Sequence, residues 1–275
     1  MMFLERLYGV TVSVGFGDYL NVALAHNRPM LDRCVVVTLP SDKETQKIAG
    51  KHNCDLVVTV DGEGCKPPPP GATPTQLGVF NKGALIERGL QQLPGDGWRV
   101  FFDADIVFPG NLRQHLEGAL YDREALYGVD RINVVGWEEW QNLLATGWAT
   151  KGFEYHHFLN YPPIGLKIGA RLVYGEHGWV PIGYFQLWHA SVETVDIYRV
   201  RTYPLSSPSA AHDDVKFGLR WDRHKRVLIP EVFVAHLQTG ESSRGKNWNG
   251  RVTPRFGPKP KDALGQEVEG ESYVA

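Results

Sequence analysis

The sequence contains few cysteines, no long apolar run and almost no net charge. Three cysteines among 275 residues are too few, and odd in number, for the disulfide framework of a small secreted domain. No stretch approaches the roughly 18 consecutive apolar residues that a transmembrane helix needs. The apolar run at the start is also too short for a signal peptide. These absences predict a cytoplasmic protein without a transmembrane segment.

The charge balance argues against a large nucleic-acid-binding surface. The formal net charge is −2 at pH 7, whereas a protein that covers many phosphates carries a marked surplus of Lys and Arg. Residues 244–251 nevertheless form a basic, glycine-rich stretch that includes Lys246. Three interpretations of this stretch stay open. It is a solvated loop, or it is a lid whose cations contact a phosphate-bearing ligand. The least favoured interpretation is a binding surface for an anionic acceptor such as nucleic acid.

The first part of the chain alternates between two kinds of apolar pattern. Continuous, β-branched runs predict strands, and the segments between them have the spacing of helices. This alternation is typical of a parallel sheet with helices on its faces. The strands are predicted at residues 10–14, 34–39 and 55–60, and the helices at 20–28, 43–52 and 80–90.

The second part of the chain is less regular. Residues 151–190 are rich in Gly, Pro and aromatic residues, which suits irregular strands that frame a cleft. The chain shows neither an internal repeat nor a convincing linker, so we expect one domain over residues 1–257 and a polar tail over 258–275. Later helices are predicted at 112–121, 136–145 and 212–218, and later strands at 126–129, 226–230 and 232–237.

Two carboxylates, Asp103 and Asp105, interrupt the apolar stretch of residues 99–109. Side chains two residues apart on a strand share one face. Two carboxylates held together in a poorly solvated place repel each other unless a proton or a cation lies between them, and a divalent ion with oxygen ligands meets that need. The alternative is a turn with two solvated Asp residues.

Polar residues follow each predicted strand of the parallel sheet. In open sheets of this kind, ligands bind outside the carboxyl ends of the strands. We therefore expect one site that is lined by these segments, which are residues 13–18, 38–42, 59–61 and 103–105.

The order of these motifs resembles that of nucleotide-sugar-dependent glycosyltransferases with the GT-A fold, of the family 2-like or galactosyltransferase-like kind. The resemblance covers residues 10–237, and Asp103-Ala104-Asp105 resembles the DxD motif of that family. It implies a Rossmann-like α/β domain of the spore coat polysaccharide synthesis type, with a mainly parallel central sheet flanked by helices. It also implies a nucleotide-binding half over residues 1–110 and an acceptor-binding half over 111–257.

The resemblance further implies a metal site and a nucleotide site. Asp105 would bind Mn²⁺ or Mg²⁺ directly, Asp103 would contact the ribose or, through water, the metal, and His236 would complete the metal sphere. Imidazole with carboxylate and phosphate oxygens suits Mn²⁺. Asn81 and Lys82 lie in the segment that touches the nucleotide. By position alone, the residues expected to hold the base and ribose are Ser13, Asp18, Thr38, Asp42 and Asp61.

Asp213 and Asp214 resemble the acidic pair that inverting members of the family place at a helix start. By that match Asp214 is the catalytic base and Asp213 its alternate; the other interpretation is that both acids only cap a helix. Tyr184 and Trp188 lie where the family places the acceptor platform, although both rings could equally be core.

We thus predict a metal-dependent, inverting glycosyltransferase. Its donor would be a nucleotide diphosphate sugar, with a UDP-sugar favoured, and its acceptor a hydroxyl of a glycan, a protein or a modified nucleic acid. One alternative is a nucleotidyltransferase that makes nucleotide sugars. Such enzymes usually carry a basic, glycine-rich loop after the first strand, and residues 14–18 contain no cation. The other alternative is a non-catalytic sugar-binding protein on the same fold.

Overall fold

The computed structural model describes residues 5–59, 81–152, 167–169, 173, 175–193, 201–205, 212–240, 247 and 250–258. Within these ranges no helix has the length and apolar character needed to cross a membrane.

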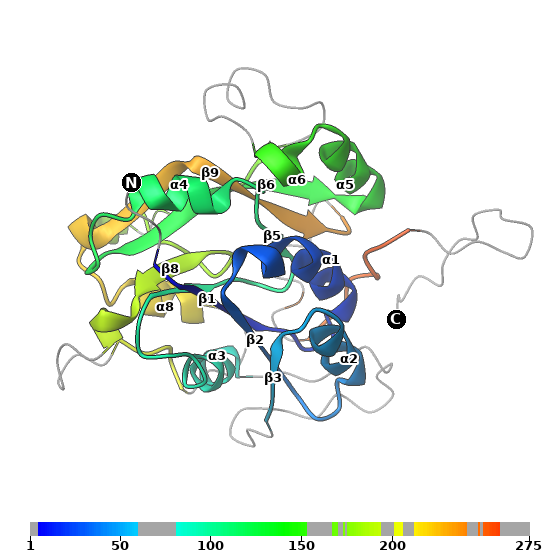
Figure 1. Cartoon of the computed structure of the whole chain (residues 1–275), viewed down its shortest axis with the longest axis horizontal. Helices are drawn as coiled ribbons and strands as arrows, with labels where there is room; N and C mark the ends of the chain where they lie inside the picture. The colour runs from blue at the N-terminus through cyan, green and yellow to red at the C-terminus, as the bar shows by residue number, and fades with distance from the viewer. Residues whose placement is uncertain are drawn as a thin grey trace, which may run out of the picture.

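One mixed sheet runs through both halves of the described chain (Figure 1). Its strand order is β3-β2-β1-β4-β8-β6-β9-β5, and β7 pairs with β6. The pairs β1–β2, β1–β4, β2–β3 and β6–β9 are parallel and hold most of the paired residues. The strands are β1 (Leu7–Val12), β2 (Arg33–Thr38), β3 (Asp55–Val58), β4 (Trp98–Phe101), β5 (Ile106–Val107), β6 (Leu126–Val135), β7 (Lys167–Ile168), β8 (Gln186–His189) and β9 (Arg226–Gln238).

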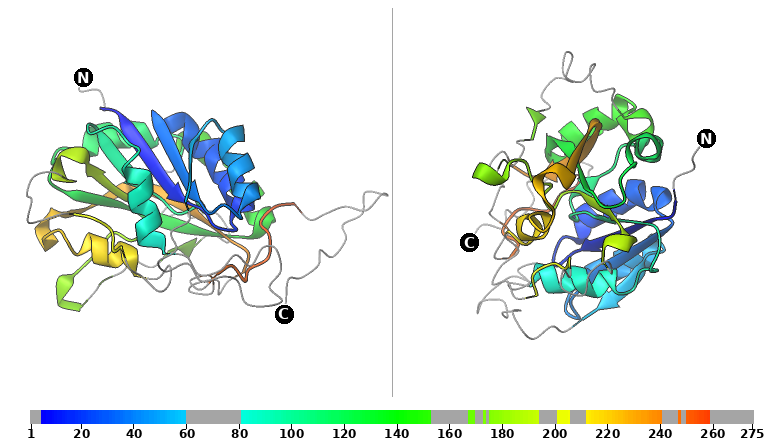
Figure 2. Two further views of the ribbon diagram at one scale, coloured as in Figure 1. Left: turned by 90° about the horizontal axis from the view of Figure 1, so that it is seen from below. Right: turned by 90° about the vertical axis from the view of Figure 1, so that its left-hand side faces the viewer.

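Helices cover both faces of the sheet (Figure 2). Apolar residues of α1, α2 and α4 pack on one face, and those of α3 and α8 pack on the other. The α-helices are α1 (Gly17–Asn27), α2 (Lys43–Lys51), α3 (Lys82–Leu90), α4 (Leu112–Ala119), α5 (Gly136–Ala145), α6 (Trp148–Lys151) and α8 (Asp213–Gly218). Short 3₁₀ turns occupy η1 (Arg28–Met30), η2 (Gly175–His177), η3 (Ala190–Glu193) and η4 (Arg223–Lys225).

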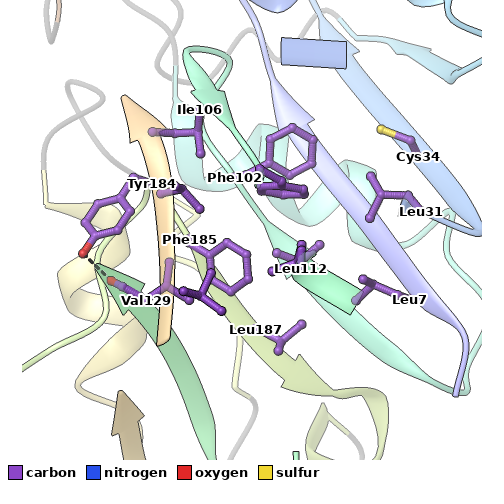
Figure 3. Close-up of a cluster of buried hydrophobic side chains, with 14 of the residues drawn as sticks. Leu7, Leu31, Cys34, Phe102, Ile106, Leu112, Val129, Tyr184, Phe185 and Leu187 are labelled. Carbon is purple, nitrogen blue, oxygen red and sulfur yellow. Dashed lines mark hydrogen bonds between the residues drawn. The ribbon is translucent and has the colours of Figure 1, made fainter. Parts of the chain in front are cut away.

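The core follows from the continuous hydrophobicity of the inner strands. Val35 and Val37 of β2 face the α3 side, whereas Cys34 and Val36 face the α1 side, as the alternation of side chains along a strand requires. Figure 3 shows the cluster on the α1 side, where Phe102 packs in the centre of the cluster. Because strands buried on both faces have no polar side, they read as unbroken apolar runs in the sequence.

The α/β class and the mainly parallel sheet flanked by helices agree with the sequence prediction. Two local predictions need correction. The strands predicted separately at residues 226–230 and 232–237 are one strand, β9, which runs from Arg226 to Gln238. The strand predicted at 126–129 continues to Val135, because its partner β9 runs beside it along its whole length.

Candidate active site

The turn between β4 and β5 carries both carboxylates of the predicted metal motif. The backbone carbonyl of Asp103 accepts from the Ile106 N–H, and the carbonyl of Asp105 accepts from the Leu237 N–H of β9 (2.9 Å). These bonds fix the turn at the carboxyl end of β4, beside β9. The sequence therefore placed the two acids at the correct edge of the sheet.

Asp105 and His236 meet across the β5–β9 pair. Ile106 lies opposite His236 in the register, and the Nε2 of His236 is 3.3 Å from the Oδ2 of Asp105. The other ring nitrogen, Nδ1, is 2.9 Å from the Gln238 Nε2 and 3.4 Å from the Asn133 Oδ1. The two amides thus hold the ring so that Nε2 faces the carboxylate.

Asp105 also has an oxygen without a partner. Its Oδ1 is buried and, within the described part of the chain, makes no hydrogen bond. Burial alone would raise the pKa of this carboxyl, but the charges of His236 and Lys82 outweigh it and the pKa lies below its ordinary value. Asp105 is therefore an ionised acid with one free acceptor atom.

Lys82 brings a positive charge to the same place. The first residue of α3, it donates from Nζ to the Asp103 Oδ1 at 2.5 Å. Burial would lower the pKa of Lys82, but the charges of Asp103 and Asp214 raise it above the ordinary value. Burial also raises the pKa of Asp103, against the opposing charge of Lys82. The ammonium group thus remains charged and lies among the acids.

The acidic pair opens α8 as predicted, but its two members are held differently. His212, with φ of 68°, turns the chain into the helix. Asp213 is fully buried, and its Oδ2 accepts from the Gly83 N–H at 3.0 Å. A Cβ on Gly83 would lie 2.1 Å from the Pro204 carbonyl oxygen, so only glycine permits this close packing of α3 against the segment 201–205.

Asp214 is partly exposed and faces the cluster. Its Oδ2 accepts from the Gly183 N–H at 2.5 Å, and its Oδ1 accepts from the Val215 N–H at 2.8 Å. A Cβ placed on Gly183 would lie 3.1 Å from the Asp214 Oδ2 and 3.3 Å from the Lys82 Nζ. The structure therefore brings together five predicted residues, which we call the open cluster: Lys82, Asp103, Asp105, Asp214 and His236.

The open cluster fits a divalent ion in part. Asp105 supplies an unpartnered carboxylate oxygen, and His236 supplies an imidazole nitrogen next to it; this donor set suits Mn²⁺. In the described residues, no group of three or more His, Cys, Asp or Glu side chains is close enough to hold an ion by itself. Asp105 and His236 would therefore need further ligands from outside this set, such as the oxygens of a bound diphosphate.

A second set of polar residues follows β1 and β2. Asp42 caps α2 by accepting from the Thr45 N–H at 3.0 Å, and its other oxygen accepts from the Gly15 N–H and from the hydroxyls of Thr38 and Thr45. Ser13 bonds to the Thr45 hydroxyl at 2.9 Å. These bonds join the strand ends to α2 and engage three of the residues predicted to hold base and ribose, which are Ser13, Thr38 and Asp42.

Asp18 is likewise occupied. It forms a buried, two-point ion pair with Arg251 and accepts from the Phe256 N–H. Arg251 also donates to the Gly15 carbonyl at 2.7 Å. Residues 250–258 thus form a strap across the loop after β1, and the carboxylate predicted for the nucleotide binds this strap.

The remaining predicted residues are placed as follows. Asn81 is buried, caps α3 by accepting from the Ala84 N–H and donates to the Leu205 carbonyl at 2.6 Å. Its role is to hold the start of the helix that carries Lys82. Asp61 and Lys246 lie outside the described residues.

The predicted aromatic platform is core in this structure. Trp188 is fully buried, packs edge-on against Phe217 and donates from its indole to Glu193. Tyr184 is 5% exposed and donates from its hydroxyl to the Val129 carbonyl at 2.7 Å. Figure 3 shows this bond on the α1 side of the sheet. Neither ring offers an open face for a sugar, because both serve the packing of β8 and its neighbours.

The sequence reasoning missed the two amides behind His236. Gln238 lies two residues after His236 on β9, hence on the same face of the strand, so its nearness could have been inferred. Asn133 comes from β6, and only the β6–β9 register brings it opposite His236. Such outer partners orient a ligating imidazole.

No protein-family model matches the chain, and no curated protein matches it. Among solved structures, glucosyl-3-phosphoglycerate synthase from Mycobacterium tuberculosis, in complex with uridine diphosphate, matches with a TM-score of 0.45 and 12% identity, over 87% of this chain and 73% of that one. Mannosyl-3-phosphoglycerate synthase from Rubrobacter xylanophilus gives 0.45 and 14%, over 88% and 68%.

A third match is 4-diphosphocytidyl-2C-methyl-D-erythritol synthase from Anaerococcus prevotii, with a TM-score of 0.39 and 10% identity, over 87% of this chain and 90% of that one. The structure is thus similar, at low identity, to GT-A-type glycosyltransferases. The residues of the open cluster carry the functional conclusion.

Proposed function

We propose that this chain is a metal-dependent, inverting glycosyltransferase that uses a nucleotide diphosphate sugar, with a UDP-sugar as the favoured donor. One observation carries the proposal. A buried, ionised carboxylate with an unpartnered oxygen, Asp105, lies beside an oriented imidazole at the ligand-binding edge of the sheet. Such an unpaired acceptor is costly in a folded protein unless a ligand or a cation meets it.

In this proposal the two charges of the cluster serve the donor. Asp105 and His236 would hold a divalent ion, which supplies Lewis-acid stabilisation of the negative charge on the leaving diphosphate. Lys82 donates to Asp103 in the structure and would turn a hydrogen atom toward a phosphate oxygen, since an ammonium group has three donors. The same groups would suit a nucleotidyltransferase, which remains the second candidate.

Asp214 would act on the acceptor. Its two backbone hydrogen bonds fix the carboxylate without using all its lone pairs. During transfer the acceptor oxygen would form the new bond to the anomeric carbon while the bond from that carbon to the diphosphate oxygen breaks. The acceptor proton would pass to Asp214, and the diphosphate would leave with the bonding electrons. A positioned base of this kind contributes about 10²–10⁴-fold.

The test is thermal unfolding of the full chain with Mn²⁺ and a panel of nucleotide diphosphates and nucleotide sugars. A ligand at 100 times its Kd stabilises a protein by about 2.7 kcal/mol. We expect a shift that needs both the metal and one nucleotide, and that disappears in Asp105→Asn. The stabilising nucleotide sugar, labelled in its sugar, is then incubated with the protein, with and without added pyrophosphate. Release of nucleoside diphosphate without pyrophosphate indicates a glycosyltransferase, whereas conversion with pyrophosphate to nucleoside triphosphate and labelled sugar 1-phosphate indicates a nucleotidyltransferase. The absence of a shift with any nucleotide would contradict both.

A further inference from the structure

Cys34 and Cys54 lie side by side at the amino-terminal ends of the neighbouring strands β2 and β3, whereas the open cluster lies at the carboxyl ends of the strands. The parallel pair β2–β3 begins with Val35 opposite Asp55, so Cys34 and Cys54, each one residue earlier, stand at the same level. Neighbouring strands are about 4.8 Å apart, and disulfides join Cα atoms about 4.4–6.8 Å apart. The backbone therefore already has a spacing that a disulfide accepts.

The two side chains also point to the same side. Cys34 is buried in the cluster that contains Leu31 and Phe102, and Cys54 packs against that cluster from its rim (Figure 3 shows Cys34 beside Leu31). Both thiols are free. Cys54 is partly exposed, whereas Cys34 is 1% exposed. Cys54 can thus react with a small solute from solvent, whereas Cys34 is buried next to it.

The surroundings favour Cys54 as the reactive thiol. A hydrogen bond from Cys34 lowers the pKa of Cys54, and the positive charge of Arg28 acts in the same direction, against burial and Asp55. Arg28 is fixed there by its bond from Nε to the Asn53 carbonyl (3.1 Å). The pKa of Cys34 is raised, first by its hydrogen bond to Cys54 and then by burial. Of the two thiols, Cys54 is therefore the one that ionises more readily and reacts first.

We propose that Cys34 and Cys54 are a redox-sensitive pair that closes reversibly to a disulfide between β2 and β3 in the presence of a hydroperoxide. The Cys54 thiolate attacks one oxygen of hydrogen peroxide, the O–O bond breaks, and hydroxide leaves; Cys54 becomes a sulfenic acid. The Cys34 sulfur then attacks the Cys54 sulfur, the S–O bond breaks, and the departing hydroxide takes the Cys34 proton. The first hydroxide takes up the proton that Cys54 released when it ionised, so in total two thiols are oxidised and one peroxide is reduced to two waters.

The position of the pair separates it from the proposed catalysis. Both cysteines precede their strands' first shared residue pair, whereas the open cluster lies at the carboxyl ends of the strands. The disulfide would close a loop that contains α2, and would tie the edge strand β3 to the inner strand β2. This proposal concerns a modification site and does not depend on the proposed function.

The test uses the full chain carrying Cys65→Ser, which removes the third cysteine. Hydrogen peroxide is added to the reduced protein, and free thiols, intact mass and non-reduced peptides are measured. We expect both thiols to be lost together, with the loss of two hydrogen masses, a linked peptide of Cys34 and Cys54, and full reversal by dithiothreitol.

Two further variants keep the test decisive. With Cys34→Ser, oxidation should stop at a sulfenic acid on Cys54 that dimedone traps. With Cys54→Ser, the buried Cys34 should react at least about tenfold more slowly than Cys54 does, because access governs thiol oxidation. Oxidation of Cys54 to a sulfinic acid while Cys34 stays free, or equally fast loss of Cys34 in Cys54→Ser, would overturn the proposal.

Discussion

Two groups of acids lie along one edge of the sheet, and they are built in opposite ways. Asp18 and Asp42, after β1 and at the start of α2, have their oxygens engaged by donors within the chain. In the open cluster, Asp105 keeps a buried oxygen without any partner in the described residues, and Lys82 lies among several carboxylates.

The difference shows how to separate structural from chemical acids at one edge. A buried carboxylate that accepts hydrogen bonds from several elements holds those elements together, and removal of one of its partners is costly. A carboxylate with an unmet oxygen lowers stability in the free protein and gains its partner only on binding. Position after a strand end does not distinguish the two kinds; the hydrogen-bond inventory does.

The largest expected effect is on turnover. Asp214→Asn keeps one oxygen as the acceptor for the Gly183 N–H, gives up the acceptor for the Val215 N–H and removes the proposed base. We therefore expect the rate of sugar transfer to fall by about 10²–10⁴-fold. Metal-dependent nucleotide binding, measured by calorimetry, should change less than about twofold. The exposed acid Asp222 provides the matched control as Asp222→Asn. Turnover within threefold of the parent would remove Asp214 from the role of base.

The next effect is on the stability that the buried ion pair of Asp18 and Arg251 contributes. Arg251→Ala leaves Asp18 buried and charged, and breaking a buried pair in this way costs about 3–5 kcal/mol. The control is Arg255→Ala, which breaks an exposed pair with Glu44 and should cost about 0–1 kcal/mol. Both are measured by urea unfolding. Equal losses for the two variants would show that the strap contributes no more than a surface ion pair.

A partly buried acid of α3, Glu87, should give stability a pH dependence. Burial raises the pKa of Glu87 to about 7, although the Tyr203 N–H donates to it at 2.6 Å and opposes the rise. A raised pKa means that the native state holds the proton longer, so this contribution is full below about pH 4.5 and is lost as the pH rises through about 7.

Glu87→Gln keeps the acceptor for Tyr203 and removes the titration. At pH 8 the variant should be more stable than the parent by about 1–3 kcal/mol, and near pH 4.5 the two should agree. Chemical unfolding at several pH values measures the difference. A constant difference over this range would show that Glu87 titrates normally in the folded protein.

The smallest expected effect on stability belongs to Asp105→Asn. In the free protein the change removes a charge that repels Asp103, and this gain offsets the loss of the attraction of Asp105 to His236 and Lys82. We expect the free energy of unfolding to change by less than about 1 kcal/mol, while the Mn²⁺-dependent shift is lost. A loss as large as that of Arg251→Ala would place Asp105 in the structural group.

Much of the fold was accessible from the sequence. The apolar runs of β1, β2 and β4 and the punctuation by Pro and Gly predicted the parallel half, because buried strands must be continuously apolar. The late strand with His236 and the helix that opens with Asp213 were predicted for similar local reasons. What local pattern could not supply was the pairing of β6 with β9, which joins segments about a hundred residues apart.

The candidate site was only partly accessible for the same reason. Asp103 and Asp105 can be recognised from the sequence, because they place two charges in an apolar run. Asp18 and Asp42 have the same chemistry and a similar position, and only the partners that reach them, Arg251 and Thr45, show that they are structural. Trp188 resembled a platform residue in sequence, but burial is set by the neighbours that pack on it. Distant partners decide these roles.

The residues in and around the open cluster are far apart in the sequence, and this separation has a consequence for folding. Asn133 and His236 are 103 positions apart, and Gly83 and Asp213 are 130 apart. Contacts of such high order form late, after the cost of closing long loops has been met. During synthesis, the strand–helix units of the first half can associate while His236 and Asp214 do not yet exist. The parallel strands of the first half would therefore form before the open cluster is complete. A nascent or truncated chain that lacks Asp214 and His236 would be partly folded and inactive.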